Sequence, residues 1–198
     1  DSETQRVEVH RNPLGVVGAI IPWNFPVFLL AFKLPAALLA GNSIVIKPAP
    51  TTPLTTLRLG ELIANVLPAG LVNIIADKND LGDKITTHKG ISKISFTGST
   101  ATGSRVLASA ASTLKRVTLE LGGNDAGIVM DDVDVEAVAP QIFDGAFGNN
   151  GQICIAMKRV YAHESIYDKL VDQLAELAKE AAVGNGLEQG TKLGPLQN

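Results

Sequence analysis

Short apolar runs rich in β-branched residues alternate along the chain with longer segments of helical periodicity. Such runs have the length and composition of strands that are buried on both faces, as in a parallel sheet. We predict strands at 6–10, 16–21, 44–47, 72–75, 94–97, 118–121, 126–130 and 160–162. We predict helices at about 26–40, 53–67, 80–86, 100–110, 135–148 and 165–182, the third of them capped by Asp80. Regular alternation of this kind predicts an open, mainly parallel Rossmann-like α/β sheet flanked by helices.

Residues with candidate chemistry follow several of these strands. Ligands of open α/β sheets bind outside the carboxyl ends of the strands. We therefore expect one edge of the sheet to carry Trp23, Asn24, Lys47, Ser99 and Glu120.

The composition is that of an ordinary globular protein. Of the 198 residues, 45% are hydrophobic and 19% are charged, and the net charge of -3 gives no electrostatic reason to expect nucleic acid or an anionic membrane as a partner. The apolar stretch 25–39 contains Pro26, Lys33 and Pro35 and is too short to span a bilayer. No signal peptide or metal site is recognised, so a cytoplasmic setting is the expectation.

The chain has one cysteine, Cys154, which follows a polar, turn-forming run at 149–152. A lone cysteine forms no internal disulfide, so its thiol is either inert filling or a reactive group. The flanking Ile153 and Ile155 could place a thiolate beside a water-poor pocket. Free cysteine mostly behaves as a small buried hydrophobe, so this pattern alone leaves both interpretations open.

The segment 98–103 joins a predicted strand to a predicted helix. Its small residues Gly98, Ser99 and Gly103 would let an anion approach the helix N-terminus, although a plain turn with a hydroxyl cap fits equally well. The segment matches neither the G-x-G-x-x-G fingerprint nor a P-loop. Lys47 at the end of a strand could reach a ribose or a phosphate, or it could be a solvated charge.

Glu120 lies in the apolar run 117–121. Burial without a cation would make this carboxylate a base near neutral pH, whereas an edge strand would leave it in solvent. Asn24 lies between Trp23 and Phe25, where its amide could donate to a developing oxyanion or serve as an ordinary turn residue.

These residues form a consistent chemical set. A thiolate can attack a carbonyl carbon, an amide can stabilise the resulting oxyanion, and the tetrahedral adduct can lose a hydride to a nicotinamide. A carboxylate can then activate the water that hydrolyses the thioester.

Five motifs follow one another along nearly the whole chain. They are Pro22-Trp23-Asn24-Phe25-Pro26, Lys47-Pro48, Phe96-Thr97-Gly98-Ser99-Thr100 with Gly103, Glu120-Leu121-Gly122-Gly123-Asn124, and Gly151-Gln152-Ile153-Cys154 with Arg159. In this order they resemble the NAD(P)-dependent aldehyde dehydrogenase superfamily. The resemblance implies that residues 1–121 form most of a cofactor-binding domain and that residues 122–198 begin an α/β catalytic domain.

The resemblance also implies a role for each matching residue. Cys154 would be the nucleophile, Glu120 the general base, and Asn24 the oxyanion donor together with the Cys154 backbone N–H. The implied cofactor-binding residues are Trp23, Lys47, Gly98, Ser99, Gly103, Leu121 and Gly122. The implied substrate entrance is apolar, which favours an aliphatic or aromatic aldehyde, and it consists of Phe25, Phe28, Leu29, Phe32, Ile153 and Ile155.

The expected cofactor is NAD, with NADP use left open. Many NAD-preferring members of the family have Lys-Pro-Ser-Glu where this chain reads Lys47-Pro48-Ala49-Pro50, and their glutamate binds the ribose hydroxyls. With Pro50 in that place, the motif itself offers no charge that repels a 2′-phosphate.

Members of the family are much longer than this chain. The chain resembles an internal piece that lacks their N-terminal segment, the rest of the catalytic domain and the oligomerisation tail. The full-length protein is expected to be a homo-oligomer. We expect little aldehyde oxidation from these 198 residues alone, because the substrate pocket would lack a wall.

Two other functions remain open beside hydrolytic oxidation of a small aldehyde. A coenzyme A-acylating dehydrogenase would release an acyl-CoA, but such members generally lack the base that Glu120 supplies. A non-catalytic nucleotide-binding derivative would keep the fold without a reactive thiol, so its Cys154 would react with an alkylating reagent no faster than a free thiol.

Overall fold

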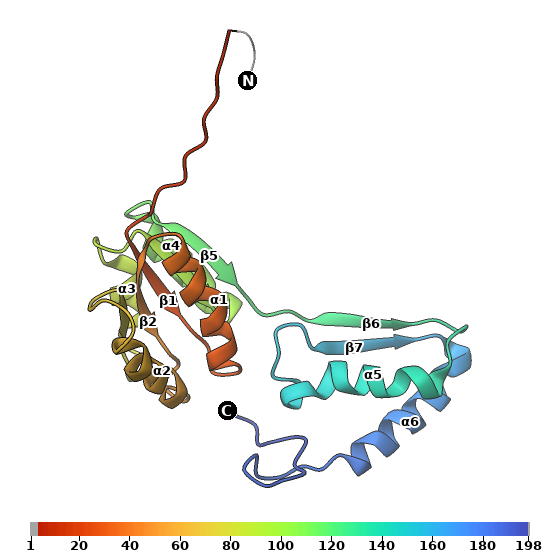
Figure 1. The fold of residues 1–198 in the computed structure, drawn as a ribbon. Coiled ribbons are helices and arrows are strands. Elements are labelled where there is room, and N and C mark those ends of the chain that lie inside the picture. The colour runs from red at the N-terminus through yellow and green to blue at the C-terminus, as the bar shows by residue number, and fades with distance from the viewer. Residues whose placement is uncertain (1–3, 198) are drawn as a thin grey trace. The chain divides into compact units, whose positions relative to one another are not determined.

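The computed structural model describes residues 4–197, which form two compact units (Figure 1). The first unit ends at Glu120 and the second begins at Leu121. Assignment of the first unit to cofactor binding and the second to catalysis stays a prediction.

The first unit is built on one parallel sheet. Its strands are β1 (Val16–Ile20), β2 (Ser43–Lys47), β3 (Val72–Ile74), β4 (Lys93–Thr97) and β5 (Arg116–Glu120), in the order β3-β2-β1-β4-β5. All four pairings are parallel. The predicted open parallel α/β sheet is therefore confirmed, and its strand order reverses between β1 and β4.

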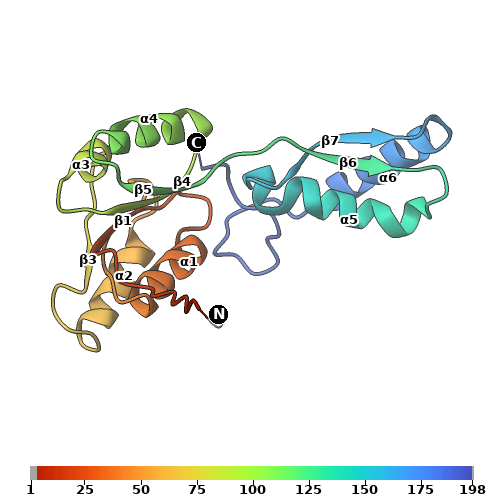
Figure 2. The same ribbon diagram turned by 90° about the horizontal axis from the view of Figure 1, so that it is seen from above.

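Helices cover both faces of this sheet (Figure 2). The helices α1 (Pro26–Leu39) and α2 (Leu54–Ala64) lie on one face, and α3 (Gly82–Thr87) and α4 (Thr100–Ala111) lie on the other. Side chains of a strand alternate between faces, so each strand contributes side chains to the apolar layers on both faces of the sheet. The layer under α1 consists of Val17, Ala19, Ile21, Leu30, Leu34, Ala37, Ile44 and Ile46.

Two local predictions differ from the structure. Residues 6–10 form no strand, because their alternating pattern buries no face here and Val9 is 83% exposed. Asp80 does not cap α3, because its carboxylate accepts a hydrogen bond from the backbone N–H of Lys78 (3.3 Å). Asp77 instead accepts from the N–H of Leu81, the residue before α3, at 2.9 Å.

The second unit consists of a two-stranded parallel sheet with helices packed against it. Its strands are β6 (Asp125–Val129) and β7 (Met157–Ala162), and its helices are α5 (Val135–Phe147), the short 3-10 turns η1 (Gly148–Gly151) and η2 (Glu164–Ile166), and α6 (Tyr167–Glu180). Their shared core contains Val129, Val135, Ala139, Ile142 and Leu170. Between residues 4 and 197, none of the helices has both the length and the apolar character needed to cross a membrane.

Asn42 fixes the start of β2 against the segment that leads into β1. Its side-chain oxygen accepts hydrogen bonds from the N–H groups of Leu14 (2.6 Å) and Gly15 (3.1 Å), and its amide donates to the carbonyls of Ala37 (3.2 Å) and Ala40 (3.4 Å). The residue is 4% exposed, so water cannot replace these bonds.

We expect Asn42→Ala to lower the free energy of unfolding by about 2 kcal/mol, because it leaves buried backbone groups without partners. Urea unfolding of the full chain measures this change. The matched control is Asn73→Ala, which removes one exposed bond to the Gly70 carbonyl (2.9 Å). The control should change the unfolding free energy by less than about 0.5 kcal/mol. Equal losses in the two variants would contradict the assignment.

Candidate functional site

The parallel register brings four strand ends together along one edge of the first unit. Ile20 pairs with both Lys47 and Phe96, and Thr97 pairs with Glu120, so β1, β2, β4 and β5 end level with one another. Trp23 and Asn24 lie partly buried just beyond β1. The structure therefore brings Trp23, Asn24, Lys47, Ser99 and Glu120 to the same edge, as their spacing predicted.

The segment 98–103 opens the 12-residue helix α4 at this edge. The Ser99 hydroxyl accepts a hydrogen bond from the N–H of Thr102 (3.2 Å), which is a standard N-cap. A side chain at Gly98 would meet the Phe96 ring at 2.6 Å, so this position has no room for one. Residues 99–102 are exposed, so the start of the helix faces solvent. Gly103 is buried in the first turn. The helix start therefore fits an anion such as a pyrophosphate.

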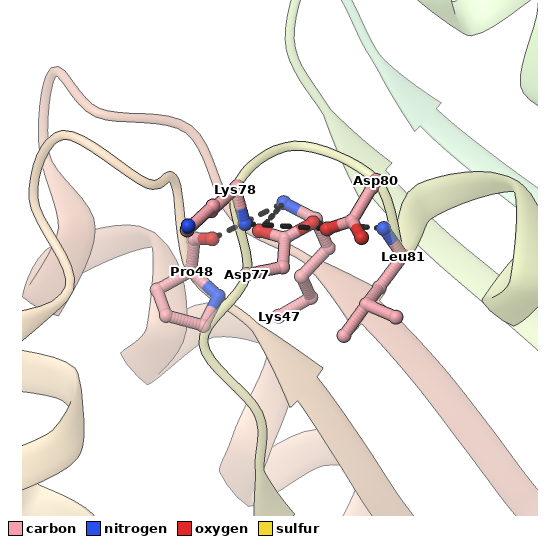
Figure 3. Close-up of polar contacts among 6 residues, drawn as sticks. All are labelled: Lys47, Pro48, Asp77, Lys78, Asp80 and Leu81. Atoms are coloured by element: carbon pink, nitrogen blue, oxygen red, sulfur yellow. Dashed lines mark hydrogen bonds and ion pairs between the residues drawn. The ribbon is translucent and has the colours of Figure 1, made fainter.

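Lys47 is neither solvated nor free to move. Its ammonium nitrogen lies 2.9 Å from an oxygen of Asp77, and the two side chains are 4% and 0% exposed (Figure 3). Burial raises the pKa of Asp77, but hydrogen bonds from Leu81, Lys47 and Asn79 and the charge of Lys47 outweigh it, so the pKa lies below its usual value. The Asp77 carboxylate is therefore ionised at neutral pH.

Glu120 is exposed at the end of the edge strand β5. The structure thus supports the solvent-facing placement and not burial in an apolar strand. Glu120 acts electrostatically on Lys33 of α1, a buried lysine whose ammonium donates to the Ser95 hydroxyl (3.0 Å). Burial lowers the pKa of Lys33 to about 8, the charge of Glu120 raises it, and the charge of Lys93 lowers it.

Three of the predicted substrate residues form an aromatic ladder along α1. The rings of Phe28 and Phe32 meet edge-to-face at 4.8 Å, and those of Phe25 and Phe28 lie 6.3 Å apart. Phe28 and Phe32 are exposed. Leu29 packs instead against the core of the first unit, so it is separate from this apolar surface.

The cysteine loop of the second unit has an unusual backbone. Asn149 (φ 49°), Asn150 (φ 59°) and Gly151 (φ 70°) are all left-handed, a conformation that asparagine and glycine tolerate best. The Asn150 amide donates to the Gly194 carbonyl (2.7 Å), and the Lys158 ammonium donates to the Gly151 carbonyl. These bonds fix the loop immediately before Cys154.

Cys154 is exposed, with partly buried Ile153 and exposed Ile155 beside it. The segment that follows Glu120 runs close to this turn, because a side chain at Gly123 would meet the Cys154 carbonyl oxygen at 2.6 Å. Arg159 adds a second link by donating to the Asn124 carbonyl (2.8 Å). Leu121 is partly buried and Gly122 is exposed in the same segment.

Two cavities lie away from these residues. In the first unit a cavity of about 410 Å³ is lined mainly by apolar side chains, among them Val16, Val45, Ile85 and Ile91. In the second unit a cavity of about 320 Å³ lies between α5, α6 and Lys192. Neither contains a predicted site residue, so we do not place the chemistry in either.

Comparison with known proteins decides the family. The model of the aldehyde dehydrogenase family matches residues 1–198. The chain belongs to the aldehyde dehydrogenase family. It is 47% identical over 191 residues to a mitochondrial aldehyde dehydrogenase of Leishmania tarentolae and 44% identical over 193 residues to phenylacetaldehyde dehydrogenase of Pseudomonas fluorescens. These alignments cover 95% and 96% of the chain, which spans 38% of the length of each relative.

Several solved structures have the same fold. The betaine aldehyde dehydrogenase of Staphylococcus aureus in complex with NAD+ matches with a TM-score of 0.90 and 38% identity, over 94% of this chain and 37% of that one. PnpE in complex with nicotinamide adenine dinucleotide matches with a TM-score of 0.92 and 43% identity, over 95% of this chain and 39% of that one. An NADP-dependent enzyme of E. coli matches with a TM-score of 0.90 and 37% identity, over 94% of this chain and 39% of that one.

Sequence reasoning missed two buried charged side chains of the first unit, Lys33 and Asp77. Lys33 lies on the buried face of α1 with Leu30, Leu34 and Ala37. Lysine is rarely buried, so a lysine on an apolar helix face indicates a specific partner or role. Asp77 follows β3 closely, and an acid just beyond a strand end belongs to the same edge as the other candidates. Its pairing with Lys47 depends on contacts between distant segments, which no local pattern shows.

We expect Gly123→Ala to lower the free energy of unfolding by about 1–3 kcal/mol, because its new methyl group overlaps the Cys154 carbonyl. It should also change the alkylation rate of Cys154 by displacing the turn. Gly122→Ala is the matched control for stability, since a side chain there meets no atom within 4 Å. Urea unfolding and iodoacetamide kinetics measure both effects, and identical behaviour of the two variants would refute the close approach.

Lys33 should make stability depend on pH. Its pKa is about 8 in the folded chain and 10.5 unfolded, so the unfolded state binds more protons between these values and stability rises with pH across that window. Below pH 8 the cost of burying the ammonium is fully present. Lys33→Met should reduce this rise and leave the part due to Lys93, whose pKa burial also lowers, whereas the exposed Lys89→Met should retain the whole rise. Urea unfolding from pH 7 to 11 tests this, and parallel profiles for wild type and Lys33→Met would contradict it.

Proposed function

We propose that the full-length protein oxidises a small aldehyde to the carboxylic acid with a nicotinamide dinucleotide cofactor. The observation that carries this proposal is the shared carboxyl edge of the first unit, where the strand order reverses and where Asn24, Lys47, Ser99 and Glu120 all lie. Such an edge is the general site of dinucleotide binding in open α/β sheets. The family membership of the chain supports the same conclusion.

The residues at this edge fit a dinucleotide. The exposed N-terminus of α4 suits a pyrophosphate, and the proposal assigns Gly98, Ser99 and Gly103 to that part of the site. Lys47 lies at the adenosine ribose in this proposal, and Trp23, Leu121 and Gly122 line the rest of the cofactor site. The bound cofactor supplies the hydride acceptor. Similar proteins have been solved with NAD+, and one is described as NADP-dependent, so the proposal includes either nucleotide.

The reaction assigns one role to each of three residues. The Cys154 thiolate attacks the aldehyde carbon to form a thiohemiacetal, and the Asn24 amide together with the Cys154 N–H stabilises the oxyanion. After oxidation, the acyl group remains on the cysteine as a thioester. The Glu120 carboxylate takes a proton from water, which then releases the acid. The exposed thiol, in a turn fixed by several hydrogen bonds, supports the role of nucleophile.

The aromatic ladder of α1 supports an apolar substrate. Phe25, Phe28 and Phe32 offer rings that would bind an aliphatic or aromatic aldehyde better than a charged one, and Ile153 and Ile155 add apolar surface beside the thiol. A relative is described as a phenylacetaldehyde dehydrogenase, which is consistent with this class. Homo-oligomeric assembly and a cytoplasmic setting remain predictions from the sequence.

We expect Glu120→Gln to separate the two halves of the reaction. The variant should still form about one reduced cofactor per thiol in a first turnover, whereas its steady-state rate should fall by about 10²-fold or more, because thioester hydrolysis loses its base. Cys154→Ser should abolish both phases. Stopped-flow absorbance at the reduced-nicotinamide band measures them with an aldehyde panel.

An unchanged steady-state rate in Glu120→Gln would contradict the role of Glu120 as base. Product analysis of wild type in the presence of coenzyme A provides a further check. Free acid is expected, whereas an acyl-CoA product would show that the protein is an acylating dehydrogenase instead.

A further inference from the structure

A buried ion pair between Lys47 and Asp77 lies at the carboxyl end of β2 in the first unit. The Lys47 ammonium lies 2.9 Å from one oxygen of Asp77 and also donates to the Pro48 carbonyl (3.3 Å). The other Asp77 oxygen accepts from the N–H of Leu81 (2.9 Å). Figure 3 shows the loop after β3 wrapped around this carboxylate. Asp77 therefore determines both the position of the Lys47 ammonium and the charge beside it.

The pair lies within reach of the proposed dinucleotide site. Strand β2 is the neighbour of β1, and β1 is the neighbour of β4, which leads to the helix α4. Adjacent strands are about 4.8 Å apart, so the end of β2 is about 10 Å from the end of β4. A nucleoside joined to a pyrophosphate at α4 spans such a distance.

The charges at this strand end cancel. Two cations, Lys47 and Lys78, stand beside two anions, Asp77 and Asp80. Lys47 and Asp77 are buried, whereas Lys78 and Asp80 are exposed and are screened by solvent and salt. The lowered pKa of Asp77 keeps its carboxylate ionised at neutral pH. The lysine at the proposed ribose site thus carries a charge that its own partner neutralises.

We propose that Asp77 is a specificity-determining residue that makes the cofactor site favour NAD+ over NADP+. This inference rests on the proposed function, because it places the adenosine ribose at Lys47. Asp77 acts through Lys47 and is therefore a positioning residue. It supplies the negative charge that Pro50 does not.

The discrimination follows from charge. A ribose 2′-hydroxyl is neutral and needs only a hydrogen-bond donor, and an ammonium with two partners still has a third N–H to offer. A 2′-phosphate carries about two negative charges and needs a net positive counter-charge. Buried charges are poorly screened, so the Asp77 carboxylate removes the attraction of Lys47 for that phosphate.

The test is nucleotide binding without any aldehyde, measured by isothermal titration calorimetry on the full-length protein. Wild type should bind NAD+ more tightly than NADP+. Asp77→Asn keeps the shape and the acceptor for the Leu81 N–H but removes the charge. It should reduce the ratio of the NADP+ to the NAD+ dissociation constant by about tenfold or more, chiefly through tighter NADP+ binding.

The matched control is Asp80→Asn, which removes an exposed carboxylate from the same loop. It should leave the ratio within about twofold of wild type, because its charge is screened. Asp77→Ser provides a second uncharged variant with an acceptor, in case Asp77→Asn does not fold as judged by circular dichroism. It should shift the ratio in the same direction.

Four results would overturn the inference. If the Asp77 variants retain NAD+ binding and the ratio of the two dissociation constants is unchanged, this inference alone is contradicted. An equal loss of both affinities also contradicts it, because it indicates a purely structural role for Asp77. If Asp80→Asn shifts this ratio as much as the Asp77 variants do, the overall charge of the loop, and not the buried ion pair, determines the preference. If wild type binds neither nucleotide, the proposed function fails together with the inference.

Discussion

The parallel register of the sheet in the first unit is the constraint on which the site depends. Because β1, β2, β4 and β5 run in the same direction and end level, every residue that follows them reaches the same edge. The reversal of strand order between β1 and β4 sends the following helices to opposite faces and leaves the edge open for a ligand. A shift of one residue in this register would turn Lys47 and Glu120 to the other face of the sheet.

Two buried lysines of the first unit respond to burial in different ways. Lys47 has an anionic partner within 2.9 Å and stays fixed, whereas Lys33 has a neutral hydroxyl as its hydrogen-bond partner and has a lowered pKa. The two lysines therefore illustrate the two outcomes of burial, which are pairing and a shifted protonation equilibrium. Lys47 lies at the carboxyl edge, whereas Lys33 donates to Ser95 in the middle of β4, where the charge of Glu120 still acts on it.

The sequence predicted what depends on local pattern. Apolar runs such as 16–21 and 94–97 are strands because only a parallel sheet buries both their faces, and Ser99 caps α4 because a hydroxyl precedes the helix. The pattern at 6–10 was misleading, because alternation predicts a strand only where a face is buried. The left-handed run at Asn149 and Asn150 and the Lys47–Asp77 pair depend on distant contacts, so the motifs identified the candidate residues but not their partners.

The most direct test of the central claim is amide hydrogen exchange of the full-length protein with and without NAD+. We expect slower exchange at the carboxyl edge of the first unit, at Trp23, Lys47 and the amides of residues 99–103. We expect no change at the opposite edge, around Gly15, Ser43 and Ser92. Protection confined to that opposite edge, or to the cavity lined by Val16 and Ile91, would contradict it.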